Sequence, residues 1–271
     1  MRTWLSLLIA LIVAAPTALI GHADDETPAE PAAAEAAEAA APEAEGDFDP
    51  MTLSSAEFLA WARRPPIENS FTIMKGTITH RADRKNHVVN VQFRARMDPR
   101  RIIGQFIIDD NERYGVSQVF ADGAQGTTVL QERAAPEGHK TLRDFGLRPT
   151  DLTLSFLYWD FLEEVEPERI ANRRVRVYRL RHAKSKEICV VAIDAIALFP
   201  LRAEWTLDGA EKPYRKLEFK SFLNRDGVLI PSQAKISNTG WKTELRFTDV
   251  VLKRVDEETP VPTDLFVIDG Q

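Results

Sequence analysis

The side chains that most often perform chemistry are spread thinly along this sequence. Histidine can bind a metal or move a proton, but none of the five stands three or four residues from another, as on one face of a helix: His22, His80, His87, His139 and His182. His80 and His87 could meet across a hairpin, because residues 81–86 form a loop between two predicted strands. We interpret them as surface histidines and expect no metal site.

Candidate nucleophiles and acids are equally isolated. The sequence has no Gly-x-Ser-x-Gly elbow and no glycine-rich phosphate loop. Asp109, Asp110 and Asp194 fall in predicted turns and strands. The single cysteine, Cys189, lies in an apolar run, where we expect a buried thiol without a disulfide partner. We therefore expect no catalytic residue, no cofactor and no enzymatic activity; a hydrolase acting on envelope lipid or polysaccharide is the third of three functions considered below.

The most apolar segment of the chain is Leu152–Leu162, which we predict to be a helix. It carries more large apolar side chains than one helix face can bury, so it needs apolar contacts on two sides. Either it is a core helix between two layers or it is a lid over an apolar cavity. Its apolar residues are Leu152, Leu154, Phe156, Leu157, Trp159, Phe161 and Leu162.

Alternation of apolar and polar residues predicts that strands surround this segment. The clearest is His87–Met97, in which Val89, Val91 and Phe93 face one way. Short turns between the strands indicate hairpins rather than crossover helices. Eleven strands are predicted: 71–80, 87–97, 101–108, 113–120, 126–131, 173–182, 187–196, 201–207, 216–224, 228–237 and 242–254. A short helix at Ser54–Arg63 precedes them, capped by Thr52 or Ser54 and stopped by Pro65–Pro66.

These elements predict a mainly β (α+β) fold. We expect a large curved antiparallel sheet, or unclosed β-barrel, with helices laid over its concave face; a two-sheet sandwich is the alternative. Five arginines in the strand Arg173–Arg181 point to both faces, which indicates a strand at the edge of the sheet. Such an edge would either resist aggregation or meet anionic lipid headgroups.

The N-terminal residues predict export. Residues 1–23 have the charge, apolar run and small-residue end of a signal peptide, with a retained membrane anchor as the alternative. Residues 24–50 are rich in Ala, Glu and Pro and are expected to be a disordered acidic linker, leaving 51–271 as one domain. The net charge of −6 belongs mostly to the linker. The rest is only slightly basic, which argues against nucleic acid as a partner.

Four stretches together resemble the LolA/LolB superfamily of periplasmic outer-membrane lipoprotein-sorting proteins: Asp151–Trp159, Phe199–Gly209, Leu217–Pro231 and Lys242–Val250. The resemblance spans most of residues 51–267. It implies an unclosed barrel with a helical lid over an apolar cavity that takes acyl chains. It also implies an arginine that holds the lid closed, for which Arg94 and Arg101 are candidates.

The resemblance implies a monomeric, non-enzymatic periplasmic carrier or chaperone that shelters the acyl chains of lipoproteins, or another hydrophobic ligand, during outer-membrane lipoprotein sorting. Candidate partners are lipoprotein acyl chains or lipid, and inner- or outer-membrane transfer proteins. The alternative is a lipid-sensing regulatory module resembling RseB. The residues expected to bind the ligand are Val89, Val91, Phe93, Leu152, Phe156, Trp159 and Phe161. Plain core packing is an equal interpretation of the same apolar residues.

Overall fold

The computed structural model describes residues 49–64, 69–121, 124–225 and 228–267. The predicted signal peptide, nearly all of the predicted linker, Pro65–Pro66 and the turn at 226–227 lie outside the described residues. In these ranges no helix is both long enough and apolar enough to cross a membrane.

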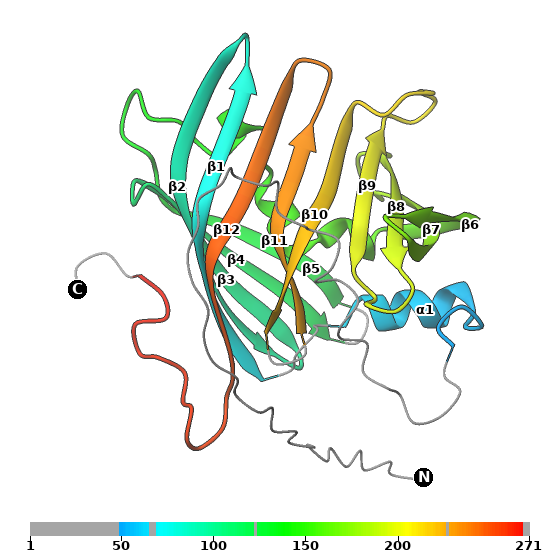
Figure 1. The fold of residues 1–271 in the computed structure, drawn as a ribbon, viewed down its shortest axis with the longest axis horizontal. Helices are drawn as coiled ribbons and strands as arrows, with labels where there is room; N and C mark the ends of the chain where they lie inside the picture. Colours follow the sequence, from blue (N-terminus) through cyan, green and yellow to red (C-terminus); the bar gives the residue numbers. More distant parts are fainter. Residues whose placement is uncertain (1–48, 65–68, 122–123, 226–227, 268–271) are drawn as a thin grey trace, which may run out of the picture.

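The described residues build one curved antiparallel sheet (Figure 1). Its twelve strands lie in the order β5-β4-β3-β2-β1-β12-β11-β10-β9-β8-β7-β6. This confirms the predicted curved, unclosed sheet, and the two-sheet sandwich is wrong. The strands are β1 (Ser70–Ala82), β2 (Lys85–Asp98), β3 (Arg101–Ile108), β4 (Glu112–Ala121), β5 (Ala124–Arg133), β6 (Asp160–Ile170), β7 (Arg173–Arg181), β8 (Ile188–Asp194), β9 (Pro200–Thr206), β10 (Arg215–Arg225), β11 (Val228–Ser237) and β12 (Trp241–Arg254).

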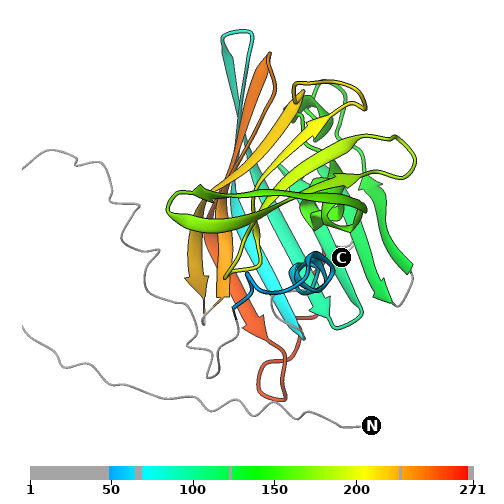
Figure 2. The same ribbon diagram turned by 90° about the vertical axis from the view of Figure 1, so that its right-hand side faces the viewer.

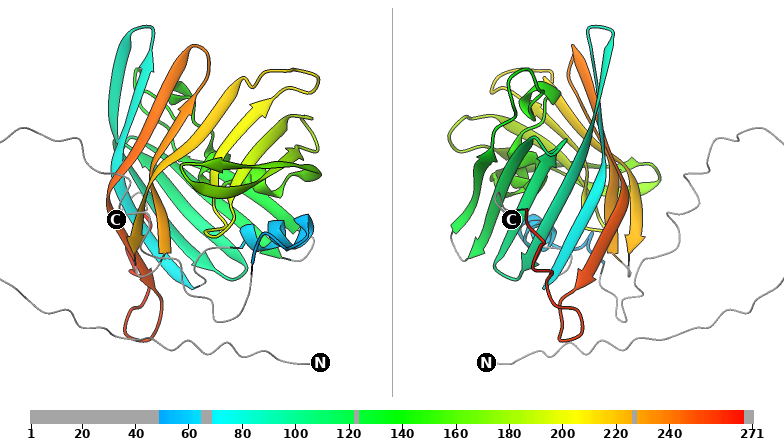
Figure 3. Two further views of the ribbon diagram at one scale, coloured as in Figure 1. Left: turned by 45° about the vertical axis from the view of Figure 1, so that its right-hand side comes forward. Right: turned by 90° about the vertical axis from the view of Figure 1, so that its left-hand side faces the viewer.

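The path of the chain explains how the concave face is covered. Strands β1 to β5 run outward from the middle of the sheet to one edge, and β6 to β12 start at the other edge and return to the middle. The connection between the two edge strands therefore crosses the open side of the curved sheet. It contains three short 3₁₀ helices, η2 (Arg143–Phe145), η3 (Pro149–Thr153) and η4 (Ser155–Tyr158), of which η3 contacts β4 and β5, and η4 contacts β5 (Figures 2 and 3).

The hydrophobic core lies between the concave face of the sheet and this connection. One continuous cluster joins side chains from both, including Phe106 of β3, Trp205 of β9 and Phe145 of η2, each at most 1% exposed. The alternation predicted for β2 is confirmed, since Val91 belongs to this cluster and Val89 and Phe93 pack against it. The fold thus buries its apolar face against a segment of irregular backbone.

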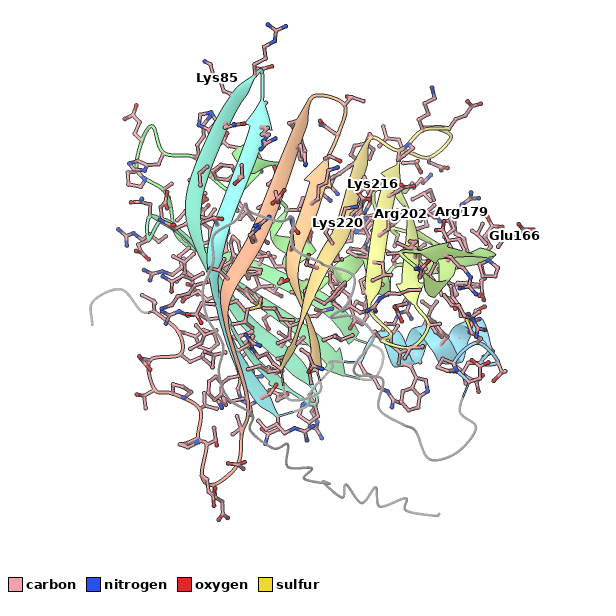
Figure 4. The ribbon with its side chains drawn as sticks, in the orientation of Figure 1. Lys85, Glu166, Arg179, Arg202, Lys216 and Lys220 are labelled. Carbon is pink, nitrogen blue, oxygen red and sulfur yellow. The ribbon has the colours of Figure 1, made fainter. Side chains whose placement is uncertain are left out.

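The opposite, convex face carries charges of alternating sign. Lys216 lies 3.5 Å from Glu204 and 3.3 Å from Glu218, and Lys220 lies 2.9 Å from Glu218. Figure 4 places Arg179, Arg202, Lys216 and Lys220 along this side of the sheet. Partly exposed ion pairs of this kind contribute little each. A small separate apolar cluster, formed by Val175, Val177, Ala192 and Leu201, is buried on the same side of β7 as Arg179.

The prediction that Arg173–Arg181 forms an edge strand is wrong. The strand β7 lies between β6 and β8, and β6 is the edge. The arginines have partners instead: Arg173 lies 2.8 Å from Asp194, and Arg179 lies 2.6 Å from Glu163. The edge strand was missed because its residues were assigned to the end of a helix and the loop that follows.

The first helix, α1 (Ser55–Ala62), is confirmed, and Ser54 is its N-cap. The Glu57 carboxylate accepts from the Ser54 amide at 3.0 Å, while the Ser54 hydroxyl accepts from the Glu57 amide at 3.3 Å. Arg176, 5% exposed, fixes the approach to this helix by donating to the Leu53 carbonyl at 2.8 Å and to the Glu164 carboxylate at 2.6 Å. The helix therefore lies against the β6–β7 end of the sheet.

The buried thiol of Cys189 tests this core. Cys189 is 0% exposed in β8, and burial raises the pKa of its thiol well above the usual value. We expect a thiol reagent to modify Cys189 only when the protein unfolds. The urea concentration at half-maximal labelling should therefore equal the midpoint of the loss of near-UV circular dichroism. Complete labelling of the native protein within minutes would contradict this packing; a sample in strong denaturant provides the reference for full reactivity.

Candidate functional site

The candidate site is the concave face together with the segment that covers it, residues 141–159, which we call the plug. The predicted helix Leu152–Leu162 is wrong. Leu154 takes a left-handed conformation (φ 52°) between η3 and η4, Trp159 is extended, and β6 begins at Asp160. The apolar residues of this segment do meet apolar groups on several sides, as predicted. The reason is different, however: the chain passes through the interior as short turns rather than as a helix.

The plug contacts the sheet mainly through aromatic side chains. Phe156, 2% exposed, meets Trp205 edge to face at a ring-centroid distance of 5.3 Å. Trp159 is only partly buried and meets His182 at 5.0 Å. Such pairs add a modest energy to the area that they bury. The plug is therefore seated by packing along much of its length.

One buried ion pair fixes the middle of the plug. Asp151 of η3 lies 2.5 Å from Arg215 of β10, and their side chains are 9% and 4% exposed. Arg215 also donates to the Gly146 carbonyl at 3.3 Å, and its guanidinium stacks 4.6 Å from the Trp205 ring centroid. The Asp151 carboxylate accepts from the Arg148 amide at 2.8 Å as well. Removing either charge would leave the other buried without its partner.

A few hydrogen bonds hold the two ends of the plug. At its start, Thr243 of β12 donates to the Phe145 carbonyl at 2.5 Å. At its end, Arg63 donates to the Leu157 carbonyl at 2.8 Å, and Tyr158 donates to the Arg63 carbonyl at 2.5 Å. Burial raises the pKa of the Tyr158 hydroxyl, so it remains a donor at neutral pH. These contacts link the plug to the sheet and to the end of α1 without adding it to the strand ladder.

A cavity of about 700 Å³ opens beside the plug. Its apolar lining comes from both the plug and the sheet, including Leu142, Leu147 and Trp241, and polar side chains such as Glu112 and Arg148 lie among them. Ligand sites commonly combine an apolar lining with a few polar groups at this size. The Glu112 carboxylate already accepts from the Leu142 amide at 2.9 Å, so part of the polar lining also positions the plug.

Six of the seven predicted ligand-binding residues belong to the extended core cluster or pack against it, and none of the seven lines the 700 Å³ cavity. Val91 and Phe156 belong to the buried core cluster, and Val89, Phe93, Leu152 and Trp159 pack against it with part of their surface still accessible. Phe161 lies apart on the edge strand β6, 46% exposed, with its ring 6.3 Å from that of Tyr178.

The residues that anchor the plug are not those expected from the resemblance. Arg94 donates to the carbonyls of Asp264 and Leu265, and Arg101 pairs with Asp98. The arginines that contact the plug from outside it are Arg215 and Arg63. The sequence around Arg215 gives no local signal for this role, because its acidic partner lies 64 residues away in sequence.

The isolated acids have structural partners. Asp109 accepts from the Asn90 amide at 2.7 Å, and Asp194 accepts from the Ile196 and Ala197 amides at 2.8 Å each. Among the described residues, no three metal-binding side chains come together. His80 and His87 do pair across the β1–β2 hairpin, as the loop between them predicts. However, His80 is 7% exposed, so the interpretation of both as surface histidines is wrong.

Comparison of the sequence with family models and with curated proteins gives no match. Solved structures do resemble this one. A domain from Vibrio parahaemolyticus described as an outer membrane lipoprotein-sorting protein domain has a TM-score of 0.53 at 13% identity, over 75% of this chain and 93% of that chain. A DUF1329 family protein from Desulfovibrio piger has a TM-score of 0.52 at 12% identity, over 72% of this chain and 90% of that chain.

A LolA superfamily protein from Nitrosomonas europaea has a TM-score of 0.49 at 14% identity, over 78% of this chain and 98% of that chain. Only the first two structures, with TM-scores above 0.5, are used in the comparison. At 12–13% sequence identity they show similarity of fold and nothing more. The predicted resemblance to lipoprotein-sorting proteins is thus confirmed for the fold, which is similar to that of the Vibrio parahaemolyticus domain.

The ion pair in the plug can be tested by breaking it. We expect Arg215→Met to lower the free energy of unfolding by about 3 kcal/mol, because Asp151 is left buried and charged. The double variant Asp151→Leu/Arg215→Met should recover part of this loss, since no charge remains unpaired. Urea unfolding measures both effects, and equal losses in the single and double variants would contradict the argument.

Two glycines provide a second test of how tightly the plug fits. Gly146 and Gly138 both have positive φ, 68° and 83°, so alanine meets a similar backbone cost at each. An added Cβ at Gly146 would lie 2.2 Å from the Trp241 ring, whereas nothing lies within 4 Å at Gly138. We expect Gly146→Ala to be more destabilising than Gly138→Ala by about 1–3 kcal/mol in thermal or urea unfolding. Equal effects would show that Trp241 moves freely aside.

Proposed function

We propose that this protein is a non-enzymatic periplasmic carrier that shelters acyl chains, of lipoproteins or of another lipid, on the concave face of its sheet. The observation that carries the proposal is the way this face is covered. A segment of short turns, held by packing and a few polar contacts, lies where a second layer of strands or helices would close a solid core.

The physical argument concerns exchange between two apolar partners. The plug covers the concave face chiefly with side chains such as Phe145, Phe156 and Leu157. An acyl chain buries the same kind of surface and contributes about 0.8 kcal/mol for each methylene removed from water. A lipid can therefore replace plug contacts without a large net change in buried apolar area. Because no polar recognition is needed, the site would accept chains of different length.

The 700 Å³ cavity gives this exchange a place to begin. Apolar residues Leu142 and Leu147 would meet the chain, while Arg148 and Tyr214 stand among the polar residues that line the same space. A lipid that enters here reaches the junction of plug and sheet near Trp241. Widening then requires the plug to move away from β9 to β12, on which Arg215 and Thr243 lie.

In this proposal the predicted ligand-binding residues keep their role. Val89, Val91 and Phe93 would form the sheet side of the site, and Leu152, Phe156 and Trp159 the plug side. Phe161 would provide exposed apolar surface beside it on the edge strand. The likeness in fold to a domain described as lipoprotein-sorting supports this proposal, as does the predicted signal peptide. Membrane proteins that pass lipoproteins on are the proposed partners, and the protein is proposed to act as a monomer.

Neighbouring valines on β2 provide a matched test of acyl binding. Val89 packs against the core cluster, whereas Val88 is 63% exposed and points to the other face. We expect Val89→Asn to weaken binding of a fluorescent fatty acid about tenfold, since it places an amide in the apolar site, and Val88→Asn to leave binding unchanged. Mass spectrometry of lipid extracted from the protein purified from the periplasm identifies the natural ligand.

Three results separate the proposal from its alternatives. Equal fatty-acid affinity in the two variants would place the ligand elsewhere on the molecule. Absence of both fatty-acid binding and extracted lipid in the folded wild type would mean that the plug permanently completes a solid core. Urea midpoints of the two variants, measured alongside, separate a binding effect from a loss of folded protein.

A further inference from the structure

A second cavity, of about 240 Å³, lies at the turn end of the β1–β2 hairpin. Its polar lining includes His80 from β1, His87 and Lys85 from β2, Lys140 from the segment before η2, and Asp144 from η2. We call it the hairpin pocket. Figure 4 shows Lys85 at the tip of this hairpin, away from the convex charges on β7, β9 and β10.

The hydrogen bonds of His80 fix which of its nitrogens is available. Its Nδ1 lies 2.8 Å from the Thr243 hydroxyl. That hydroxyl gives its only proton to the Phe145 carbonyl, at 2.5 Å, because a carbonyl oxygen can only accept. The Thr243 oxygen must therefore accept from His80, so Nδ1 carries a proton. In the neutral ring Nε2 is an acceptor, and protonation turns it into a second donor.

The charges around the pocket favour an anion. Among the described residues, Lys85 and Lys140 take part in no ion pair. The carboxylate of Asp144 is already engaged, since it accepts from the Thr141 amide at 2.8 Å and from the Thr141 hydroxyl at 2.9 Å. Asp83, at the turn of the hairpin, is the other acid in the lining. The two lysines and two histidines thus outnumber the two acids of the lining, and Asp144, which acts electrostatically on Lys140 and His80, already uses its carboxylate oxygens on Thr141.

We propose that the hairpin pocket binds a phosphate-type anion, either free or as the phosphate of a lipid headgroup, between Lys85, Lys140 and the imidazoles of His80 and His87. Charge-assisted hydrogen bonds from ammonium and imidazolium groups to such oxygens are among the stronger polar contacts in proteins. The pocket is small and partly enclosed by Phe145, so it suits a compact anion rather than an acyl chain. This inference does not depend on acyl binding at the concave face.

Binding at this place should take up a proton. Burial lowers the pKa of His80, with smaller contributions from His87 and Lys140, while Asp144 opposes them. Without a ligand the ring is therefore neutral at pH 7, and its Nε2 presents a lone pair to the pocket. An anion favours the imidazolium, which can donate to it, so affinity rises as the pH falls. Lys85 and Asp83 also line the pocket, so they face the same anion site.

Sulfate is the probe for the test, because its charge does not change near neutral pH. We expect calorimetry at constant ionic strength to give an affinity at about pH 6 that is at least tenfold higher than at about pH 8. Sulfate should also shift the imidazole nitrogen resonances of His80 toward the imidazolium form. The double variant Lys85→Gln/Lys140→Gln should bind about tenfold more weakly.

Matched variants keep the result specific. Lys75→Gln removes an exposed lysine of β1, the strand that carries His80, at a position outside the pocket. It should leave sulfate affinity unchanged. His80→Gln retains a donor for Thr243 but has no titrating ring, and should reduce the pH dependence. Competition by short-chain phosphatidic acid would assign the anion to a lipid headgroup, whereas competition by inorganic phosphate alone would assign it to a free ion. No sulfate binding at about pH 6, or equal binding by the double lysine variant, would overturn the proposal.

Discussion

The concave face of the sheet is apolar and must be covered, and the rest of the structure depends on how the chain covers it. Strands β1 to β4 and β7 to β12 place the large side chains of one continuous cluster on that face. A second sheet would cover it with regular hydrogen bonding. Here the cover is the connection between the two edge strands, whose backbone groups must find partners individually. Contacts such as Arg63 to Leu157 and Thr243 to Phe145 meet that need.

This solution joins stability and function in one segment. The plug completes the core, so its packing contributes to folding, but it lies outside the ladder that holds the sheet together. Its principal fixed point is the pair Asp151–Arg215, and a buried pair is costly to separate one charge at a time. A carrier built in this way would hold its empty state closed and still release the plug when a ligand supplies equivalent apolar contact.

Much of the sheet could be predicted from sequence because alternation is a local signal. The pattern around Val89, Val91 and Phe93 predicted both the strand and its buried face correctly. The plug could not be predicted in the same way. The apolar density of Leu152–Leu162 indicated burial on several sides. It did not indicate that Leu154 would take a left-handed conformation and end η3, because no glycine or asparagine marks the break in the sequence. The partners of Asp151 and His80 lie far away in sequence, and no spacing rule reveals them.

The central seam of the sheet, where β1 pairs with β12, has a consequence for how the protein acquires its structure. Ser70 pairs with Arg254, and Ala82 with Trp241, so the first strand of the sheet must wait for the last. The other ladders of the sheet join strands that follow one another in sequence, so each half of the sheet can form locally. The β1–β12 seam closes the longest loop and therefore carries the largest loop-closure entropy, which makes it the pairing expected to limit the rate of folding.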